Sequence, residues 1–375
     1  MKPVRIKLHE LQIPFVEAFA HSAKSRTASD SFVVEIEFDN GMVGYGEGVS
    51  RPYVTGETVE ASVDHILHKV WPVLLNRDIA QDALNLCQHF PDAIEGNVAF
   101  HGAQAAVELA LIDSFLRSNG TGLHQVLPAS PEVKQIRYSG VITASSAEGV
   151  RKTAKKLKLF GITEYKLKID RERVREQIAC AREAIGPDAS LRVDGNSDFS
   201  PDEVIDLDSE FQSHHIAAIE QPTPRLPAKV WADLQKRLSI PIVADESFVT
   251  EEDAISLIEN KACQIFNLRI AKCGGVGRLL KLARRIKSAG LRYQLGCQVG
   301  ETCILSAAAR TLAAHLGDCL YVEGSYGNLL LSEDICRDRY QFGFGGLAPL
   351  NAAVGLGVDI VREKLERATV RTVQA

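Results

Sequence analysis

The chain lacks the features that mark membrane proteins and nucleic-acid-binding proteins. Its 43 basic and 48 acidic residues give a formal net charge of −5, so no excess of positive charge indicates nucleic acid or an anionic membrane as a partner. No apolar run approaches the ~18–20 residues that a membrane-spanning helix needs. The first residues, Met1 to Lys7, lack the apolar stretch of a signal peptide. We therefore expect a cytoplasmic protein.

Cys-x-x-Cys pairs are also missing from the sequence. The eight cysteines stand at positions 87, 180, 263, 273, 297, 303, 319 and 336. Thiolate zinc sites usually draw on closely spaced pairs, so the sequence does not predict one. Most of these cysteines lie in helical or apolar stretches, and we expect reduced structural thiols.

The length of 375 residues exceeds a typical single domain and fits two domains, or one barrel with an addition. A hydrophobic content of 45% with 24% charged residues is ordinary for a globular protein. Residues 1–130 are predicted to form strands followed by helices. Asp39-Asn40-Gly41 is a turn signal between two strands, and helical periodicity covers 57–75 and 104–117. We interpret this part as an α+β domain.

From residue 138 onward the pattern changes to alternating strands and helices. The predicted helices include 146–159, 171–185 and 277–289, and the predicted strands are 138–142, 165–169, 190–194, 216–220, 241–245, 265–269, 292–296 and 320–323. Eight such steps are typical of a (β/α)₈ barrel. Irregular, glycine-rich sequence follows the last strand, so we predict the modified form (β/α)₇β. The expected organisation is an N-terminal domain over 1–130, a barrel over 131–325, and a C-terminal segment, 326–375, that packs on the N-terminal domain.

Three acidic residues stand about one strand-and-helix step apart, each after a short apolar run. Asp194, Glu220 and Asp245 are separated by 220 − 194 = 26 and 245 − 220 = 25 residues. If the runs are neighbouring parallel strands, the three carboxylates meet at the carboxyl end of the barrel, where barrel enzymes bind ligands. A single such carboxylate is often only a helix N-cap. Three together, with Asn196 and Glu246 beside them, predict an all-oxygen site for a divalent ion such as Mg²⁺.

Two lysines alternate along the second predicted strand of the barrel. In Tyr165-Lys166-Leu167-Lys168-Ile169 the lysines share one face and the apolar residues share the other. If Leu167 and Ile169 pack against helices, both lysines point into the barrel. A solvated edge strand is the alternative, but a closed barrel has no edge. Two neighbouring buried cations are expected to lower the pKa of at least one lysine from about 10.4, which would make it a general base.

Charged residues are also predicted on the far side of the barrel. Asn267 and Arg269 share a face of the sixth strand, opposite the lysine pair. Arg269 can hold an anionic substrate or stabilise an enolate, but it is a poor base. Glu323 ends the last predicted strand at the mouth of the site, where it would bind a substrate cation or pair with a basic residue.

Taken together, these motifs resemble the enolase superfamily, in the branch of the muconate-lactonizing enzymes. That branch also contains dipeptide epimerases and o-succinylbenzoate synthases. The resemblance extends from the N-terminal domain to the C-terminal tail and rests on Gly44-Tyr45-Gly46-Glu47, the Lys-x-Lys pair, Asp194-Gly195-Asn196, Ile219-Glu220-Gln221-Pro222, Ala244-Asp245-Glu246-Ser247 and Lys272-Cys273-Gly274-Gly275.

The resemblance implies specific roles for these residues. Asp194, Glu220 and Asp245 would bind Mg²⁺, with Mn²⁺ as a substitute, and Lys168 would exchange the α-proton of a small carboxylate substrate. Lys166 would tune Lys168, and Glu246 would lie beside the opposite acid/base. The predicted substrate contacts are Asn196, Cys297, Glu323, Arg26 and Tyr53. Two loops of a capping domain, 15–30 and 50–58, would close over the substrate with the polar candidates His21, Ser22, Lys24, Arg26, Arg51 and Tyr53. A homo-oligomer is expected.

One position departs from the family pattern. The branch has a second catalytic lysine on strand six, where this chain has Arg269, and we expect Lys272, three residues later, to lie outside the site. The mandelate-racemase branch has a catalytic histidine where this chain has Cys297. A one-base reaction is therefore favoured, either a cycloisomerase or a syn-elimination lyase. The alternatives are an epimerase or racemase of dipeptides or N-acyl amino acids, and a barrel retained only for binding.

Overall fold

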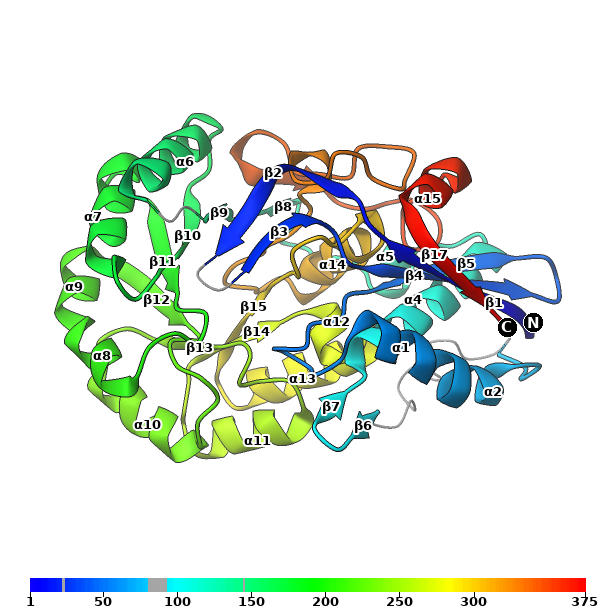
Figure 1. Ribbon diagram of the computed structural model, residues 1–375, viewed down its shortest axis with the longest axis horizontal. Helices are drawn as coiled ribbons and strands as arrows, with labels where there is room; N and C mark the ends of the chain where they lie inside the picture. The colour runs from blue at the N-terminus through cyan, green and yellow to red at the C-terminus, as the bar shows by residue number, and fades with distance from the viewer. Residues whose placement is uncertain (22–23, 80–92, 144–145) are drawn as a thin grey trace.

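A four-stranded antiparallel sheet carries both ends of the chain (Figure 1). The computed structural model describes residues 1–21, 24–79, 93–143 and 146–375, and it leaves the side chains of 17–21, 24 and 25 undescribed. The sheet order is β17-β1-β4-β5, in which Lys7 of the first strand pairs with Gln374 of the last. Its strands are β1 (Pro3–Leu11), β4 (Phe32–Phe38), β5 (Val43–Gly48) and β17 (Thr369–Gln374). The C-terminal strand thus completes the N-terminal sheet, as predicted.

Helices cover one face of this capping sheet. The alternating glycines of β5 let helix α4 (His101–Ser118) lie directly on the strand. A Cβ atom at Gly44 would lie 2.1 Å from the Ala110 carbonyl oxygen, and one at Gly46 would lie 1.9 Å from that of Ala106. The other elements here are β2 (Pro14–His21), β3 (Lys24–Ala28), α1 (Val59–His65), a π-helix (Ile66–Val70), α2 (Trp71–Leu74), β6 (Ile94–Glu95), β7 (Val98–Ala99), α5 (Leu123–Val126) and α15 (Arg362–Ala368).

Seven parallel strands form the curled sheet of the second unit, in the order β15-β14-β13-β12-β11-β10-β9. The strands are β9 (Gly140–Ile142), β10 (Glu164–Lys168), β11 (Ser190–Asp194), β12 (Ile216–Glu220), β13 (Ile242–Ala244), β14 (Ile265–Leu268) and β15 (Arg292–Leu295). The helices outside them are α6 (Ala147–Leu159), α7 (Val174–Ile185), α8 (Pro201–Asp206), α9 (Asp208–Ser213), α10 (Ala228–Arg237), α11 (Glu251–Glu259), α12 (Ile270–Cys273), α13 (Val276–Ser288) and α14 (Cys303–Leu316).

The eighth predicted strand, 320–323, is present only as a bridge. Val322 pairs with Leu295 in parallel, and the Glu323 N–H donates to the Leu295 carbonyl at 2.8 Å. On the other side the Ser139 N–H donates to the Val322 carbonyl at 2.9 Å. The barrel therefore closes as (β/α)₇β, because the short segment hydrogen-bonds to both neighbours and no helix follows it directly. The C-terminal segment contains two 3₁₀ turns, Gly327–Leu329 and Phe344–Gly346. Its strand β16 (Leu347–Pro349) pairs with β8 (Gln135–Arg137).

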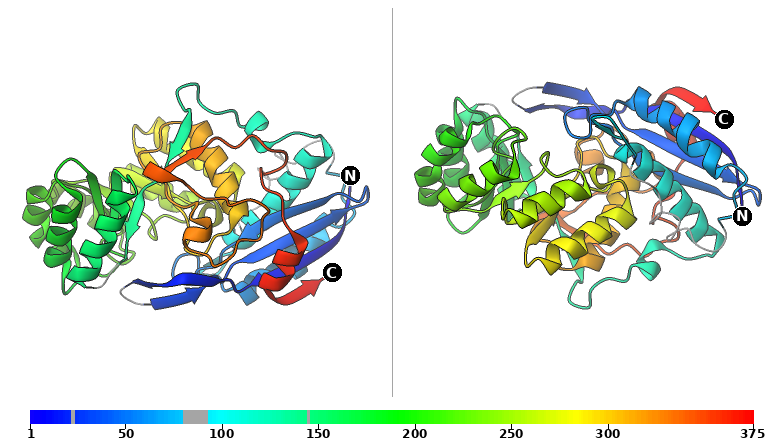
Figure 2. Two further views of the ribbon diagram at one scale, coloured as in Figure 1. Left: turned by 90° about the horizontal axis from the view of Figure 1, so that it is seen from above. Right: turned by 90° about the horizontal axis from the view of Figure 1, so that it is seen from below.

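The β2–β3 hairpin links the capping sheet to the mouth of the barrel. Figure 2 shows it leaving the capping sheet and extending toward the barrel elements α6 and β10. Phe15 at its base forms a bridge with Leu331 of the C-terminal segment. The predicted helices 146–159 and 277–289 are confirmed within one residue, whereas 171–185 begins three residues later, at Val174. Among the described residues, no helix is both long and apolar enough to cross a membrane.

Candidate active site

The three predicted metal ligands converge at the carboxyl ends of neighbouring strands. Asp194 is the partner of Glu220 in the register of β11 and β12, and Lys168 of β10 is the partner of Asp194. Asp245 follows the end of β13, the next strand. All three carboxylates are buried. The even spacing in the sequence thus places three acidic side chains at the same edge of the parallel sheet, on neighbouring strands, as expected.

Lys166 lies beneath this point and bridges its carboxylates. Its Nζ is 2.8 Å from Glu323 Oε2, 3.3 Å from Glu220 Oε1 and 3.4 Å from Asp194 Oδ2. Burial alone would lower the pKa of Lys166, but these carboxylates raise it well above its ordinary value. A lowered pKa is therefore wrong for Lys166, because each carboxylate favours the charged ammonium.

Glu323 pairs with basic residues, one of the two roles predicted for it. Besides Lys166 it contacts the guanidinium of Arg192, which is buried on β11 two residues before Asp194. Burial favours the neutral acid, yet Lys166 and Arg192 together lower the pKa of Glu323 to about 2. Glu323 is thus a fixed negative charge that holds Lys166 and Arg192 in place.

Lys168 points toward the open side of the site. Its Nζ lies 2.9 Å from Asn196 Oδ1 and 3.7 Å from Asp194 Oδ2. The Lys168 side chain is 16% exposed, whereas that of Lys166 is 4% exposed. Of the two lysines, Lys168 is therefore the more accessible to a ligand.

Asp245 is held by two cations from the far side of the barrel. Arg269 contacts Asp245 Oδ2, and Lys272 Nζ lies 2.9 Å from both Asp245 Oδ1 and the Asp245 carbonyl. Although burial favours the neutral acid, Arg269 and Lys272 lower the pKa of Asp245 below its usual range. The expectation that Lys272 lies outside the site is wrong, because the chain turns into α12 after Arg269 and carries this fully buried lysine back to a predicted metal ligand.

The donor set fits a hard divalent cation. Glu220 also accepts hydrogen bonds from Asn267 Nδ2 at 3.0 Å and Gln294 Nε2 at 2.8 Å, which fix its two oxygens. Burial raises the pKa of Glu220 to about 7 despite the charge of Lys166. Lysine and arginine side chains already lie against all three carboxylates, as expected for buried negative charge that needs a positive partner. Asp194, Glu220 and Asp245 are therefore oxygen ligands of the type that Mg²⁺ prefers, and neighbouring pairs of them share the cations Lys166 and Arg269.

A pocket of about 570 Å³ opens above these residues. Glu220 and Asp245 do not line it but contact the lining residues Lys166 and Arg269. The other predicted catalytic, metal and substrate residues line it: Asp194, Lys166, Lys168, Arg269, Glu246, Asn196, Cys297, Glu323, Arg26 and Tyr53. Glu246 is partly buried, and its pKa is raised to about 8 by loss of solvent and by the charge of Asp245. The structure thus brings together all the predicted residues whose side chains it describes.

The end of the pocket nearest the capping domain is basic. Arg26 Nη1 donates to both carboxylate oxygens of Asp30, at 2.9 and 2.7 Å, and Arg51 Nη1 lies 2.8 Å from Asp30 Oδ1. Two guanidinium groups therefore share one carboxylate. Tyr53 lines the same pocket. The side chains of His21, Ser22 and Lys24, also predicted to contact substrate, lie outside the described residues.

Some residues of the site were missed by sequence reasoning. Arg192 shares a face of β11 with Asp194, and Gln294 is the register partner of Asn267 in β14 and β15, so strand geometry could have found both. Glu301 lines the pocket from the loop before α14, and burial raises its pKa to about 8. No periodic pattern marks a loop residue of this kind.

Family models cover most of the chain. Residues 5–127 match the mandelate racemase / muconate lactonizing enzyme N-terminal domain, and residues 149–364 match the enolase C-terminal domain-like family. The chain belongs to the enolase superfamily. Within it, the chain falls in the mandelate racemase/muconate lactonizing enzyme subgroup, as the resemblance in the sequence indicated.

Several named relatives align over nearly their full length. The N-succinyl-L-Arg/Lys racemase of Bacillus cereus is 27% identical and covers 99% of this chain and 98% of its own, and its crystal structure superposes with a TM-score of 0.91 over 100% of both chains. Muconate cycloisomerase 1 of Rhodococcus opacus is 28% identical over 95% of each chain. A dipeptide epimerase of Cytophaga hutchinsonii, crystallised with Mg and D-Ala-L-Val, has the same fold, with a TM-score of 0.89 at 24% identity and 100% coverage of both chains.

These relatives favour one of the two predicted reaction types. Epimerases and racemases are more frequent among the named relatives than cycloisomerases. The epimerase alternative is thus better supported than the preferred prediction of a cycloisomerase or lyase. The protein is a member of an isomerase-rich enzyme subgroup.

Proposed function

We propose that this protein is a Mg²⁺-dependent racemase or epimerase of amino-acid derivatives that acts at the carbon next to a carboxylate. The observation that carries the proposal is the difference between the surroundings of the two lysines. Lys166 is bound to three carboxylates, whereas Lys168 faces the pocket beside Asp194. This difference supports Lys168 as the amine that would take the α-proton from a bound substrate.

The rest of the site would stabilise the product of that proton transfer. Asp194, Glu220 and Asp245 would hold Mg²⁺, which when bound supplies positive charge for the substrate carboxylate as it becomes an enediolate. Lys166 would add a second, fixed positive charge, because Glu323 and Glu220 keep it in place. Arg269 would supply a third from the opposite side of the pocket.

Inversion needs a proton donor on the opposite face of the carbon, and we assign this role to Cys297. Cys297 follows β15 and Arg269 follows β14, two paired strands, and both residues line the pocket. Burial raises the pKa of the Cys297 thiol, so it remains an S–H group. The charge of Arg269 lowers this pKa by a smaller amount. Lys168 would take the α-proton, and the S–H would donate its proton to the same carbon, leaving a thiolate near Arg269.

The basic end of the pocket indicates the kind of substrate. Arg26 and Arg51 share the single carboxylate of Asp30, which leaves an excess of positive charge there. Burial and the raised pKa of Glu301 favour its neutral form, so that residue does not offset the excess. We therefore propose an N-acyl amino acid whose acyl group carries a second carboxylate, such as a succinyl group.

A substrate screen in deuterated water tests this proposal. N-succinyl amino acids, N-acetyl amino acids, dipeptides and muconate are incubated with enzyme and Mg²⁺, and NMR and chiral chromatography follow the α-position. We expect deuterium incorporation with inversion, and faster exchange for N-succinyl than for N-acetyl substrates. Exchange of only one enantiomer, without inversion, would refute the epimerase proposal.

Variants at the two far-side residues test how the second proton is carried. Cys297→Ala is expected to preserve exchange of the enantiomer whose α-proton faces Lys168 and to slow exchange of the other at least ~100-fold. Adding Arg269→Lys to Cys297→Ala restores the lysine of the family pattern and should recover part of the lost rate, because a lysine can accept a proton.

Cys319→Ala is the matched control, because Cys319 is another free cysteine that does not line the pocket. It should exchange both enantiomers at the wild-type rate. Equal slowing of both enantiomers by Cys297→Ala would mean that Cys297 supports the site without carrying a proton.

Cycloisomerisation is the second candidate, and Arg269 is the observation that favours it. A guanidinium does not accept a proton at physiological pH, and closure of a lactone needs only one base. Conversion of muconate in the same screen, with no inversion of any amino-acid derivative, would establish this second function.

A further inference from the structure

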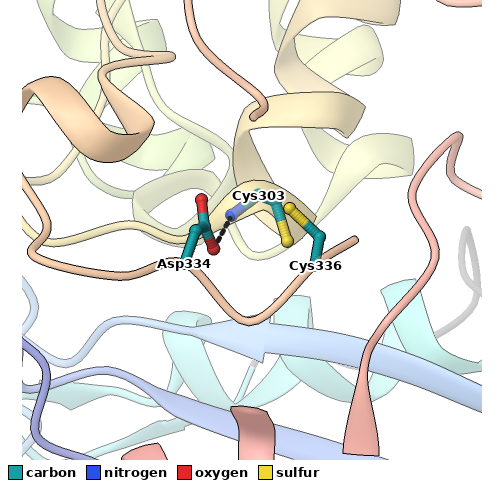
Figure 3. Close-up of side chains that lie close together, drawn as sticks. All are labelled: Cys303, Asp334 and Cys336. Atoms are coloured by element: carbon teal, nitrogen blue, oxygen red, sulfur yellow. Dashed lines mark hydrogen bonds between the residues drawn. The ribbon is translucent and has the colours of Figure 1, made fainter. Parts of the chain in front are cut away.

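Two cysteines far apart in the sequence meet outside the active site. Cys303 is the first residue of α14, and Cys336 lies in the C-terminal segment with Asp334 two residues before it. Their sulfurs and a carboxylate oxygen of Asp334 all lie within 4.8 Å of one another. Figure 3 shows the three side chains converging from the end of the helix and the neighbouring loop. Cys303 is 0%, Asp334 3% and Cys336 1% exposed.

Helix capping accounts for the hydrogen bonds of only one of the two Asp334 carboxylate oxygens. Oδ1 accepts hydrogen bonds from the backbone N–H of Cys303 at 3.2 Å and of Ile335 at 2.8 Å. Oδ2 is buried and has no hydrogen-bond partner within the described part of the chain. Leaving a buried polar atom unpaired costs about 1–3 kcal/mol. The Cys303 thiol, a weak donor, also interacts with the Asp334 carboxyl group and lowers its pKa, so a strong ligand for Oδ2 is absent among the described residues.

The surroundings make an unpaired anion more costly still. Glu47 is fully buried at the same end of α14 and accepts from Thr302 N and Oγ1, both at 2.8 Å, and from Leu305 N at 3.1 Å. Glu47 thus already occupies the positive end of the helix. Two buried carboxylates at one helix end repel unless a proton or a cation intervenes.

The donor types select the cation. Two sulfurs and one carboxylate oxygen suit Zn²⁺, whereas Mg²⁺ prefers oxygen ligands alone. Zinc–ligand bonds of about 2.0–2.3 Å place tetrahedral ligands roughly 3.5–4 Å apart, so small side-chain shifts would close the present spacing. Asp334 and Cys336 also line a surface depression of about 700 Å³, through which water could supply a fourth ligand.

We propose that Cys303, Asp334 and Cys336 bind one Zn²⁺ ion, with a water molecule as the fourth ligand. Binding releases the two thiol protons and replaces the contact between Cys336 Sγ and the Asp338 carbonyl, 3.0 Å long. The complex of Zn²⁺ with two thiolates and one carboxylate carries one negative charge. Lys364, whose Nζ lies 2.9 Å from the Cys336 carbonyl, is placed to balance it. The ion would fasten the C-terminal segment to the start of α14.

Cobalt titration of the reduced, full-length protein tests the site independently of activity. Co²⁺ bound by thiolates gives an intense near-ultraviolet charge-transfer band, whereas Co²⁺ at the all-oxygen site of the barrel does not. We expect one equivalent of Co²⁺ to produce the band, Zn²⁺ to remove it, and Mg²⁺ to leave it unchanged.

Variants assign the band to the cluster. Cys336→Ser and Asp334→Asn should lose or strongly weaken it, while Cys319→Ser, outside the cluster, should retain it. Circular dichroism shows whether each variant is folded. Cys336→Ser keeps a side chain of similar size, so it still tests the site if Asp334→Asn does not fold. Absence of the band in the folded wild type, its persistence in Cys336→Ser, or a Cys303–Cys336 disulfide found by mass spectrometry without added oxidant would overturn the proposal.

Discussion

Replacing Lys168 with alanine is expected to abolish exchange, with deuterated water, of the α-proton of the enantiomer that presents this proton to Lys168. The Lys168 amine faces the pocket, 2.9 Å from Asn196 Oδ1 and 3.7 Å from Asp194 Oδ2. Its removal takes away the proposed base, and loss of a general base typically costs on the order of 10²–10⁴ in rate. The measurement is the disappearance of the α-proton signal of a substrate identified in the screen.

Two further variants distinguish the proton-accepting role of Lys168 from the effect of its positive charge. Lys168→Arg keeps the positive charge but does not accept a proton, so it should be as inactive as Lys168→Ala. Lys155→Ala removes an exposed lysine of α6 and should exchange at the wild-type rate. Exchange of that same enantiomer by Lys168→Ala within about tenfold of wild type would assign the base to another residue.

Changing Asp245 to asparagine is expected to lower both stability and metal binding. Lys272 and Arg269 would lose the negative partner that they share in the interior, and breaking a buried ion pair in this way costs about 3–5 kcal/mol of unfolding free energy. One proposed Mg²⁺ ligand would also be lost. Mg²⁺ should raise the urea midpoint of the wild type, because it binds the folded state, and have little effect on the variant.

An exposed ion pair provides the control. Asp233 lies 3.1 Å from Lys236 on α10, and both side chains are more than 70% exposed. Asp233→Asn should unfold at the wild-type urea concentration and keep the wild-type response to Mg²⁺, because solvent screens this pair. If Asp245→Asn behaved in the same way, Asp245 would neither balance the buried cations nor bind the metal.

Short-range patterns predicted most of the fold and the centre of the site. Alternation placed Lys166 and Lys168 on one face of β10, and the repeat length placed Asp194, Glu220 and Asp245 on successive strands. Both inferences depend only on the geometry of strands in a parallel sheet. They therefore hold before any tertiary contact is known.

The errors arose where a residue's behaviour depends on distant neighbours. Lys272 follows a strand but belongs to α12, so strand alternation no longer applies to it. The pKa of Lys166 depends on Glu323, 157 residues away in the chain. Cys303 and Cys336 are 336 − 303 = 33 residues apart and have no motif spacing, although their sulfurs meet in the fold. No local pattern contains this information.

The pairing of β1 with β17 affects the order in which the protein can fold during synthesis. Lys7 pairs with Gln374, so one edge of β1 remains open until β17 has been synthesised. The barrel is built from neighbouring strand–helix units and can form earlier. Because the β2–β3 hairpin follows β1 directly and the pocket needs residues from both units, such as Arg26 and Lys168, a working site requires both units to have formed.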